Sequence, residues 1–107
     1  MVEYKELDNI FHSLADPTRR DILRRLRPHD QSVGELAEHY DLTFAAISKH
    51  IKVLEHANLV HKRKQGREQR VRLSPDALRQ ADRYLNEYRK AWEERLDRLE
   101  THLKNNI

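Results

Sequence analysis

Cysteine is missing from the 107 residues of this chain, and glycine and proline are scarce, with two and three copies. Without cysteine there is no disulfide, no thiolate nucleophile and no sulfur-ligated metal site. Two isolated glycines do not make a phosphate-cradling loop, and the sequence has neither a His-Glu-x-x-His motif nor a recognisable nucleophile with its base. The sequence therefore predicts a protein that is not an enzyme.

Long apolar segments are also missing. No run approaches the length of a transmembrane helix, and the N-terminal residues lack the apolar segment of a secretory signal. We therefore expect a cytoplasmic protein without a membrane partner.

Apolar side chains are few overall, since 37% of the residues are hydrophobic and 36% are charged. A single domain over residues 1–107 with so thin a core is marginally stable alone, and apolar surface buried against a partner chain would stabilise it. The net charge of +3 leans towards nucleic acid, although the placement of the charges matters more than their sum.

Two helices are expected in residues 1–31, a segment that we assign to the core and to dimerisation. The first, Glu3–Ala15, has one apolar stripe at helical spacing, formed by Leu7, Ile10, Phe11 and Leu14. Asp16 and Pro17 then suit the N-cap and the first position of a second helix, Pro17–Leu26.

Residues 32–57 have the pattern of a helix-turn-helix. A capping box at Ser32–Glu35 opens a helix over Ser32–Tyr40, and the break Asp41–Thr43 leads into another helix over Phe44–Ala57. A helix-turn-helix places its second helix in the major groove, so double-stranded DNA is the expected partner.

Residues 58–73 are predicted to form a basic β-hairpin, the wing. Asn58 suits a left-handed C-cap, and the strands Leu59–Lys64 and Glu68–Leu73 flank the turn Gln65-Gly66-Arg67. The cations of this hairpin are His61, Lys62, Arg63, Lys64, Arg67, Arg70 and Arg72. Strand alternation sends about half of them to each face, so not all can touch one DNA molecule. The expected fold class is α+β and mostly helical: a winged helix-turn-helix of about five helices and a two-stranded wing.

The helix Phe44–Ala57 has the side chains that a groove-reading helix needs. Ala45 and Ser48 are small enough for a close approach to base edges, and Lys49 can reach a guanine edge or a phosphate. His50 and Lys52 are expected phosphate contacts. Lysines on an outer face are often merely solvated, but the basic wing favours DNA. The alternative is a winged helix that serves as a protein-interaction or dimerisation module without specific DNA binding, in which a wing with acidic or apolar residues would be tolerated.

Residues 74–107 are predicted to form one long helix, opened by Ser74-Pro75-Asp76. Its apolar positions follow one another in steps of three and four, close to a coiled-coil seam: Leu78, Ala81, Leu85, Tyr88, Trp92, Leu96, Leu99 and Leu103. We expect this helix to self-associate, together with the first helix. The alternative is that its first half closes the core while its end frays. The predicted dimer interface comprises Leu7, Phe11, Leu85, Tyr88, Trp92, Leu96 and Leu99.

Three stretches give the chain a family resemblance. Phe11–Leu23 resembles the opening signature of the ArsR-type winged-helix repressors, Ser48–Val60 is similar to their recognition helix and its exit into the wing, and Trp92–Glu100 looks like a cysteine-free branch. The resemblance implies a homodimer, paired through its first and last helices, that binds a palindromic operator and represses transcription. By matching position, it implies DNA reading by Thr43, Ser48, Lys49 and His50, and a wing over Lys62–Arg70.

One pair of residues departs from the family pattern. Many members have glutamine-proline or a similar pair where this chain has Phe44-Ala45, and phenylalanine cannot make the bidentate contact of glutamine to adenine. We expect Phe44 either to pack on the edge of the core or to touch a thymine methyl group.

Many members of the ArsR-type family sense metals, through either a cysteine site on the third helix or an Asp-x-His site near the C-terminus. Neither of these two sites is complete in this sequence. Val33–Glu38 holds no cysteine, Asp82 is followed by Arg83-Tyr84 instead of x-His, and His102 is the only histidine of the last helix. We therefore expect no metal and no cofactor, and a metal-responsive repressor is the less favoured reading.

Overall fold

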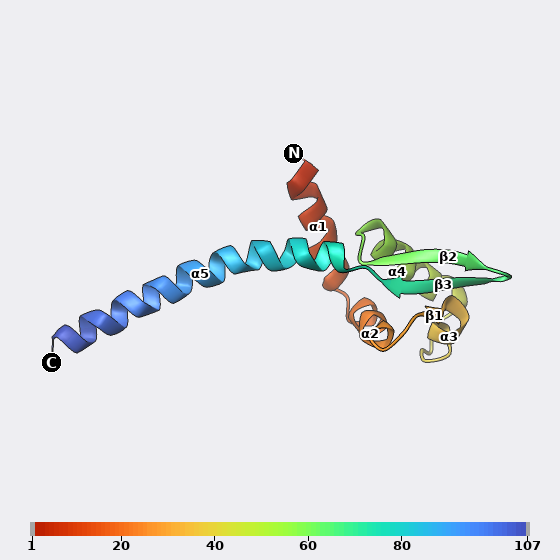
Figure 1. The fold of residues 1–107 in the computed structure, drawn as a ribbon. Coiled ribbons are helices and arrows are strands. Elements are labelled where there is room, and N and C mark those ends of the chain that lie inside the picture. Colours follow the sequence, from red (N-terminus) through yellow and green to blue (C-terminus); the bar gives the residue numbers. More distant parts are fainter. Residues whose placement is uncertain (1, 107) are drawn as a thin grey trace.

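Five helices and three short strands form along residues 2–106, the part of the chain that this computed structural model describes. In chain order they are α1 (Val2–Leu14), α2 (Pro17–Leu26), β1 (Gln31–Ser32), α3 (Val33–Ala37), α4 (Phe44–His56), β2 (Val60–Gln65), β3 (Glu68–Leu73) and α5 (Pro75–Asn105). Together α3, α4 and the β2–β3 hairpin make a winged helix-turn-helix, which confirms the predicted fold class (Figure 1).

Side-chain caps start three of the helices where the sequence predicts them. The Asp16 carboxylate accepts from the Arg19 amide at 3.0 Å at the start of α2. Ser32 and Glu35 complete both bonds of the capping box at α3, and the Thr43 hydroxyl accepts from the Ala46 amide at 3.0 Å at α4. These caps fix the first turns of the helices around the turn of the motif.

Two left-handed residues bound the first strand of the hairpin, as predicted. Asn58 has a φ of 61° and turns the chain out of α4, and Gly66 has a φ of +63° in the loop between β2 and β3. The strands pair antiparallel from Val60 opposite Leu73 to Gln65 opposite Glu68.

A third strand, β1, was not predicted from the sequence. Its two residues pair antiparallel with β3, so the sheet has the order β1-β3-β2 and β3 is its central strand. A strand of two residues is too short to show an alternating sequence pattern, so β1 is recognisable only from its pairing with β3.

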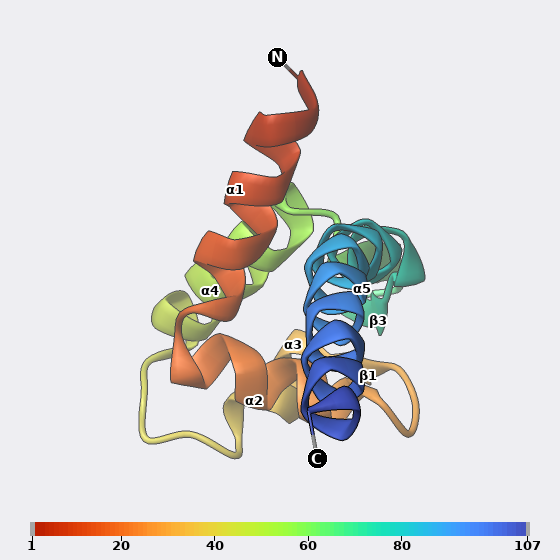
Figure 2. The ribbon, with the colours of Figure 1, turned by 90° about the vertical axis from the view of Figure 1, so that its left-hand side faces the viewer.

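The core lies between the helices and the inner face of the sheet. Side chains from α1, α2, α3, α4 and the hairpin share it, and Ile22, Leu36, Ile47, Ile51 and Leu54 are fully buried. From α5 only Ala77 and Ala81 belong to it. Beyond Ala81, every described residue of α5 except Tyr84 is exposed, so most of this helix stands clear of the body (Figures 1 and 2).

Element bounds differ from the predicted ones by one or two residues in α1, α4 and β2, and α3 is shorter, ending at Ala37 instead of Tyr40. Ser74 holds the N-cap position of α5, but its hydroxyl makes no capping bond and is buried without a partner. No helix within residues 2–106 is both long and apolar enough to cross a membrane.

Candidate nucleic-acid interface

Helix α4 has one face in the core and one face in solvent. Ile47, Ile51 and Leu54 are 0% exposed. Ala45, Lys49 and Lys52 are exposed on the other side, and Ser48 is half-buried at the boundary. The exposed side therefore brings together two cations, a small side chain and a hydroxyl, as predicted from the helical spacing.

The N-terminal turn of α4 presents apolar side chains to solvent. Phe44 is 59% exposed, and Leu42, just before the N-cap, is 46% exposed. Phe44 therefore does not pack on the edge of the core, which was one of its two expected environments. Leu42 was not singled out from the sequence, since a leucine in a turn has no periodicity to mark it.

His50 lies apart from the other predicted DNA-contacting residues of α4. Its Nδ1 is 3.3 Å from Nη1 of Arg19 and 3.9 Å from Oδ2 of Asp16, and only 24% of its side chain is exposed. It faces the beginning of α2.

The strand register divides the cations of the wing between its two faces. Lys62 and Lys64 share a face with Val60 and Val71, which are 0% exposed, so this face is turned towards the body. The opposite face is formed by His61, Arg63, Gln65, Glu68, Arg70 and Arg72.

Two of the wing cations that were predicted to contact DNA form ion pairs with glutamates of α3 and α4. Nζ of Lys62 lies 3.6 Å from Oε1 of Glu55 on α4. Nη1 of Arg70 lies 2.8 Å from Oε1 of Glu35 on α3, and its Nη2 donates to the Asp30 carbonyl at 3.0 Å. Burial by itself raises the pKa of Glu35, but the hydrogen bonds from Arg70 and Ser32 outweigh it and leave that pKa below its ordinary value. These pairs tie the wing to α3 and α4.

Arg63, Lys64 and Arg67 extend the positive charge towards the tip of the wing. Arg63 donates to the Gln65 side chain at 3.3 Å, and all three are exposed. Among the described side chains, those of residues 5–106, no acid lies within ion-pair distance of any of these three. Their charge is therefore available to an external anion.

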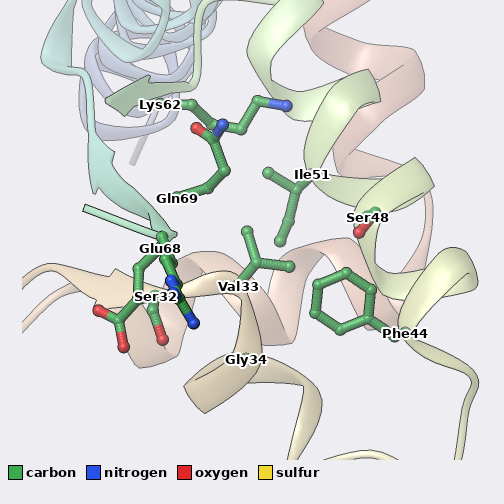
Figure 3. A pocket seen from close by; sticks show the side chains of 10 residues that line it. Ser32, Val33, Gly34, Phe44, Ser48, Ile51, Lys62, Glu68 and Gln69 are labelled. Carbon is green, nitrogen blue, oxygen red and sulfur yellow. The ribbon is translucent and has the colours of Figure 1, made fainter. Parts of the chain in front are cut away.

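A hollow of about 290 Å³ lies between α3, α4 and the wing (Figure 3). Its lining residues are Ser32, Val33, Gly34, Phe44, Ser48, Ile51, Lys62, Arg67, Glu68 and Gln69. The lining therefore combines Phe44 and Ser48 of α4 with the basic residues Lys62 and Arg67 of the wing.

A second concave surface lies on the opposite side of the core, between α1 and α5. Its volume is about 620 Å³, and it is lined by Leu7, Asp8, Phe11, Gln80, Arg83, Tyr84, Glu87 and Tyr88. The centroids of the Phe11 and Tyr84 rings, which both line this surface, lie 5.6 Å apart. Tyr84 was missed at the sequence level because it lies beside the predicted seam, not in it.

The predicted interface residues of α5 form an apolar stripe in solvent. Leu85, Tyr88, Trp92, Leu96 and Leu99 are each 54–59% exposed. Ala81, which was predicted to lie in the same seam, is instead buried in the core. Over residues 5–106, whose side chains the structure describes, no three histidine, aspartate or glutamate side chains come together as a metal site.

Comparison with known proteins gives a consistent family. A family model described as a helix-turn-helix domain matches residues 14–63. The transcriptional repressor SdpR of Bacillus subtilis is 35% identical over 56% of this chain and 67% of its own.

Two solved structures share the fold. An ArsR family transcriptional regulator superposes with a TM-score of 0.79 at 35% identity and covers 83% of this chain and 92% of its own. A homodimeric winged helix-turn-helix DNA-binding domain from Mycobacterium bovis, described as a possible ArsR-family regulator, has a TM-score of 0.65 at 23% identity and covers 71% of each chain.

Proposed function

The chain belongs to the ArsR family of winged helix-turn-helix, DNA-binding transcriptional regulators, and from this membership we propose that it is a homodimeric repressor that binds a palindromic operator. The observation that carries the proposal is the exposed side of α4, flanked by a wing in which Arg63, Lys64 and Arg67 form no ion pair with any acid among the described side chains.

Sequence reading is assigned to the exposed face of α4. Ser48 and Lys49 lie in its N-terminal half, where a recognition helix approaches base edges, and Ala45 leaves room for that approach. Thr43 caps the helix and so sets the direction of its first turn. Lys52, one turn further along, contacts a phosphate.

Phe44 is assigned to the methyl group of a thymine. The side chain of Phe44 is 59% exposed, so covering its ring with an apolar group would remove apolar surface from water and favour binding. The C5-methyl of thymine is the apolar group that the major groove offers. The departure from the family pair at Phe44-Ala45 thus predicts an operator with thymine at the matching position.

Phosphate binding is assigned to the tip of the wing. Arg63, Lys64 and Arg67 supply the charge, while Lys62 and Arg70 hold the hairpin against Glu55 and Glu35 at the angle in which the tip can reach DNA. Contacts of this kind position the protein and give affinity without base preference.

Dimerisation is assigned to the apolar stripe of α5 together with Leu7 and Phe11 of α1. Large apolar side chains at half exposure along a helix mark an interaction surface. A second copy fits because a two-fold dimer presents two identical heads, as a palindrome requires. The homodimeric state named for the Mycobacterium bovis domain supports this assembly, and the repressor name of the Bacillus subtilis relative supports the direction of regulation.

The test is binding of the purified protein to the DNA that precedes its own gene, followed by anisotropy at several salt concentrations. We expect Ser48→Ala and Lys49→Ala to cost about 1–3 kcal/mol on the operator and to relax base preference, with little effect on unrelated DNA. Lys90→Ala, an exposed lysine of α5 away from the head, is the matched control and should bind like the wild type. Equal losses on operator and unrelated DNA would assign Ser48 and Lys49 to the backbone and contradict the reading role.

A further inference from the structure

The last turn of α1 is bonded to the beginning of α2 through Arg19. Nε of Arg19 donates to the Ser13 carbonyl at 2.8 Å, and its Nη2 donates to the His12 carbonyl at 3.1 Å. Both carbonyls belong to the last turn of α1, and that of His12 also accepts from the Ala15 amide at 3.2 Å. The third nitrogen of the same guanidinium, Nη1, is the one that lies 3.3 Å from Nδ1 of His50 on α4.

A second bond joins α1 directly to α4. The Ser13 hydroxyl donates to the Val53 carbonyl of α4 at 3.5 Å, and Ser13 is 1% exposed. The end of α1 is therefore linked to α4 both at His50 and at Val53, on the side of α4 that faces away from solvent.

The short contact between Arg19 and His50 sets the roles of the two side chains in the hydrogen bond. A guanidinium has donors only, so Nδ1 of His50 must be the acceptor and the ring proton is assigned to Nε2. Asp16 balances the charge of Arg19 from its N-cap position. The hydrogen bond from the Arg19 amide lowers the pKa of Asp16, which keeps it ionised.

We propose that Arg19 and His50 are positioning residues for DNA reading: the Arg19–His50 contact holds the N-terminal half of α4 at a fixed angle to the end of α1. This inference rests on the proposed function, in which Ser48 and Lys49 read bases and α1 contributes Leu7 and Phe11 to the subunit interface. His50 directly follows these two reading residues, so a rotation of α4 that breaks its contact with Arg19 also displaces them. The same contact links the subunit interface to the reading surface through α1.

This role differs from direct contact with DNA, which the resemblance to the family implies for His50. A phosphate contact contributes to the salt dependence of binding, because each phosphate neutralised releases counterions. A positioning residue changes affinity for the correct sequence and leaves the salt dependence on unrelated DNA as it is.

The test compares His50→Ala with His50→Asn. Asparagine places its carbonyl oxygen near the position of Nδ1 and can accept from Arg19, whereas alanine cannot. Intrinsic helix propensity favours alanine over asparagine, so a weaker α4 in His50→Ala than in His50→Asn cannot come from propensity and must come from the lost contact. We expect the opposite order in operator binding, with about a tenfold loss for His50→Ala and at most about a threefold loss for His50→Asn. His56→Ala, an exposed histidine of the same helix, is the control and should bind like the wild type.

Hydrogen exchange of the free protein decides the same point without DNA. We expect faster exchange over residues 44–52 in His50→Ala, wild-type exchange there in His50→Asn, and no change in the wing. Wild-type exchange and operator affinity in His50→Ala would overturn the positioning role. Equal losses in both variants, with a smaller salt slope on unrelated DNA, would also overturn it and make His50 a phosphate contact. If the wild type itself has no preference for any operator, the proposed function fails, and the exchange rates still show whether the Arg19–His50 contact orders α4.

Discussion

A network of side-chain hydrogen bonds around one carboxylate joins α2 to the turn after α3. The Tyr40 hydroxyl donates to Oδ2 of Asp21 at 2.6 Å, and Arg24 and Arg25 donate to the same carboxylate at 2.6 and 2.9 Å. The bonds from Tyr40 and from the two arginines place the pKa of Asp21 far below its ordinary value. Desolvation, helped by the Asp21 charge, raises the pKa of Tyr40 to about 12. Through Tyr40, this carboxylate fixes the turn that leads into α4.

At the scale of that residue, Tyr40→Phe should lower the free energy of unfolding by about 1–3 kcal/mol at pH 7, because Asp21 loses its hydroxyl donor. The folded-state pKa of Asp21 is depressed, so its contribution is complete above the ordinary pKa of 3.8 and is lost as the pH falls towards the folded value. Arg24 and Arg25 still lower the pKa of Asp21 in the variant, so its deficit should be constant between pH 7 and pH 4 and shrink only as the pH falls further towards 2. Urea unfolding at pH 7, 4 and 2 measures it, and an unchanged deficit at pH 2 would assign the loss to packing.

At the scale of the elements, local signals were enough for helix starts and turns. Asp16-Pro17, the Ser32–Glu35 box and Asn58 act within four residues of themselves, so the sequence alone locates them correctly. Side chains whose partners are distant in sequence were not predictable in the same way. Lys62 and Arg70 were predicted to contact phosphates because they are positively charged. Their ion-pair partners, Glu55 and Glu35, become neighbours only when the hairpin folds onto α3 and α4.

The same limit applies to helix α5 and to His50. Heptad spacing predicted the exposed stripe of α5, yet Ala81 belongs to the core because α1 packs against the first turns of the helix. The orientation of His50 depends on Arg19, which is 31 residues away in the sequence. The spacing of residues within one helix predicts which of them share a face, but tertiary packing determines which other elements cover that face.

The two arginines Arg67 and Arg70 provide a matched pair for testing the wing. Arg67 lies in the loop at the tip, whereas Arg70 is bonded to Glu35, Glu68 and the Asp30 carbonyl. We expect Arg67→Ala to reduce the slope of log K against log salt by about 0.9 and to leave the urea midpoint unchanged. Arg70→Ala should lower the urea midpoint, since it leaves Glu35 without its partner. Identical behaviour of the two variants in both measurements would contradict the division of the wing into a contacting tip and a tethered base.

At the scale of the whole molecule, the chain is a rod with a head. Its principal extents are 69 × 32 × 21 Å, and the 31 residues of α5 account for about 46 Å of helix. The tip of the wing and the C-terminal end of α5 lie at opposite ends (Figure 1). Because α5 contributes only Ala77 and Ala81 to the core, the stability of the head is nearly independent of the rest of the helix. The distal stripe can therefore be altered without unfolding the part that reads DNA.

Leu96→Glu uses that independence to test the dimer. Leu96 is 56% exposed and lies on the stripe, so a charge there disrupts a subunit interface but no contact of the core. We expect the wild type to sediment as a dimer at micromolar concentration and Leu96→Glu as a monomer with a folded head. Operator affinity should fall by a factor of about 10²–10⁴, because two linked heads bind with avidity that one head lacks. Thr101→Glu adds the same charge on the opposite side of α5 and should remain a dimer. A dimeric Leu96→Glu variant with full operator affinity would place the subunit interface elsewhere, and the exposed stripe would then need another partner.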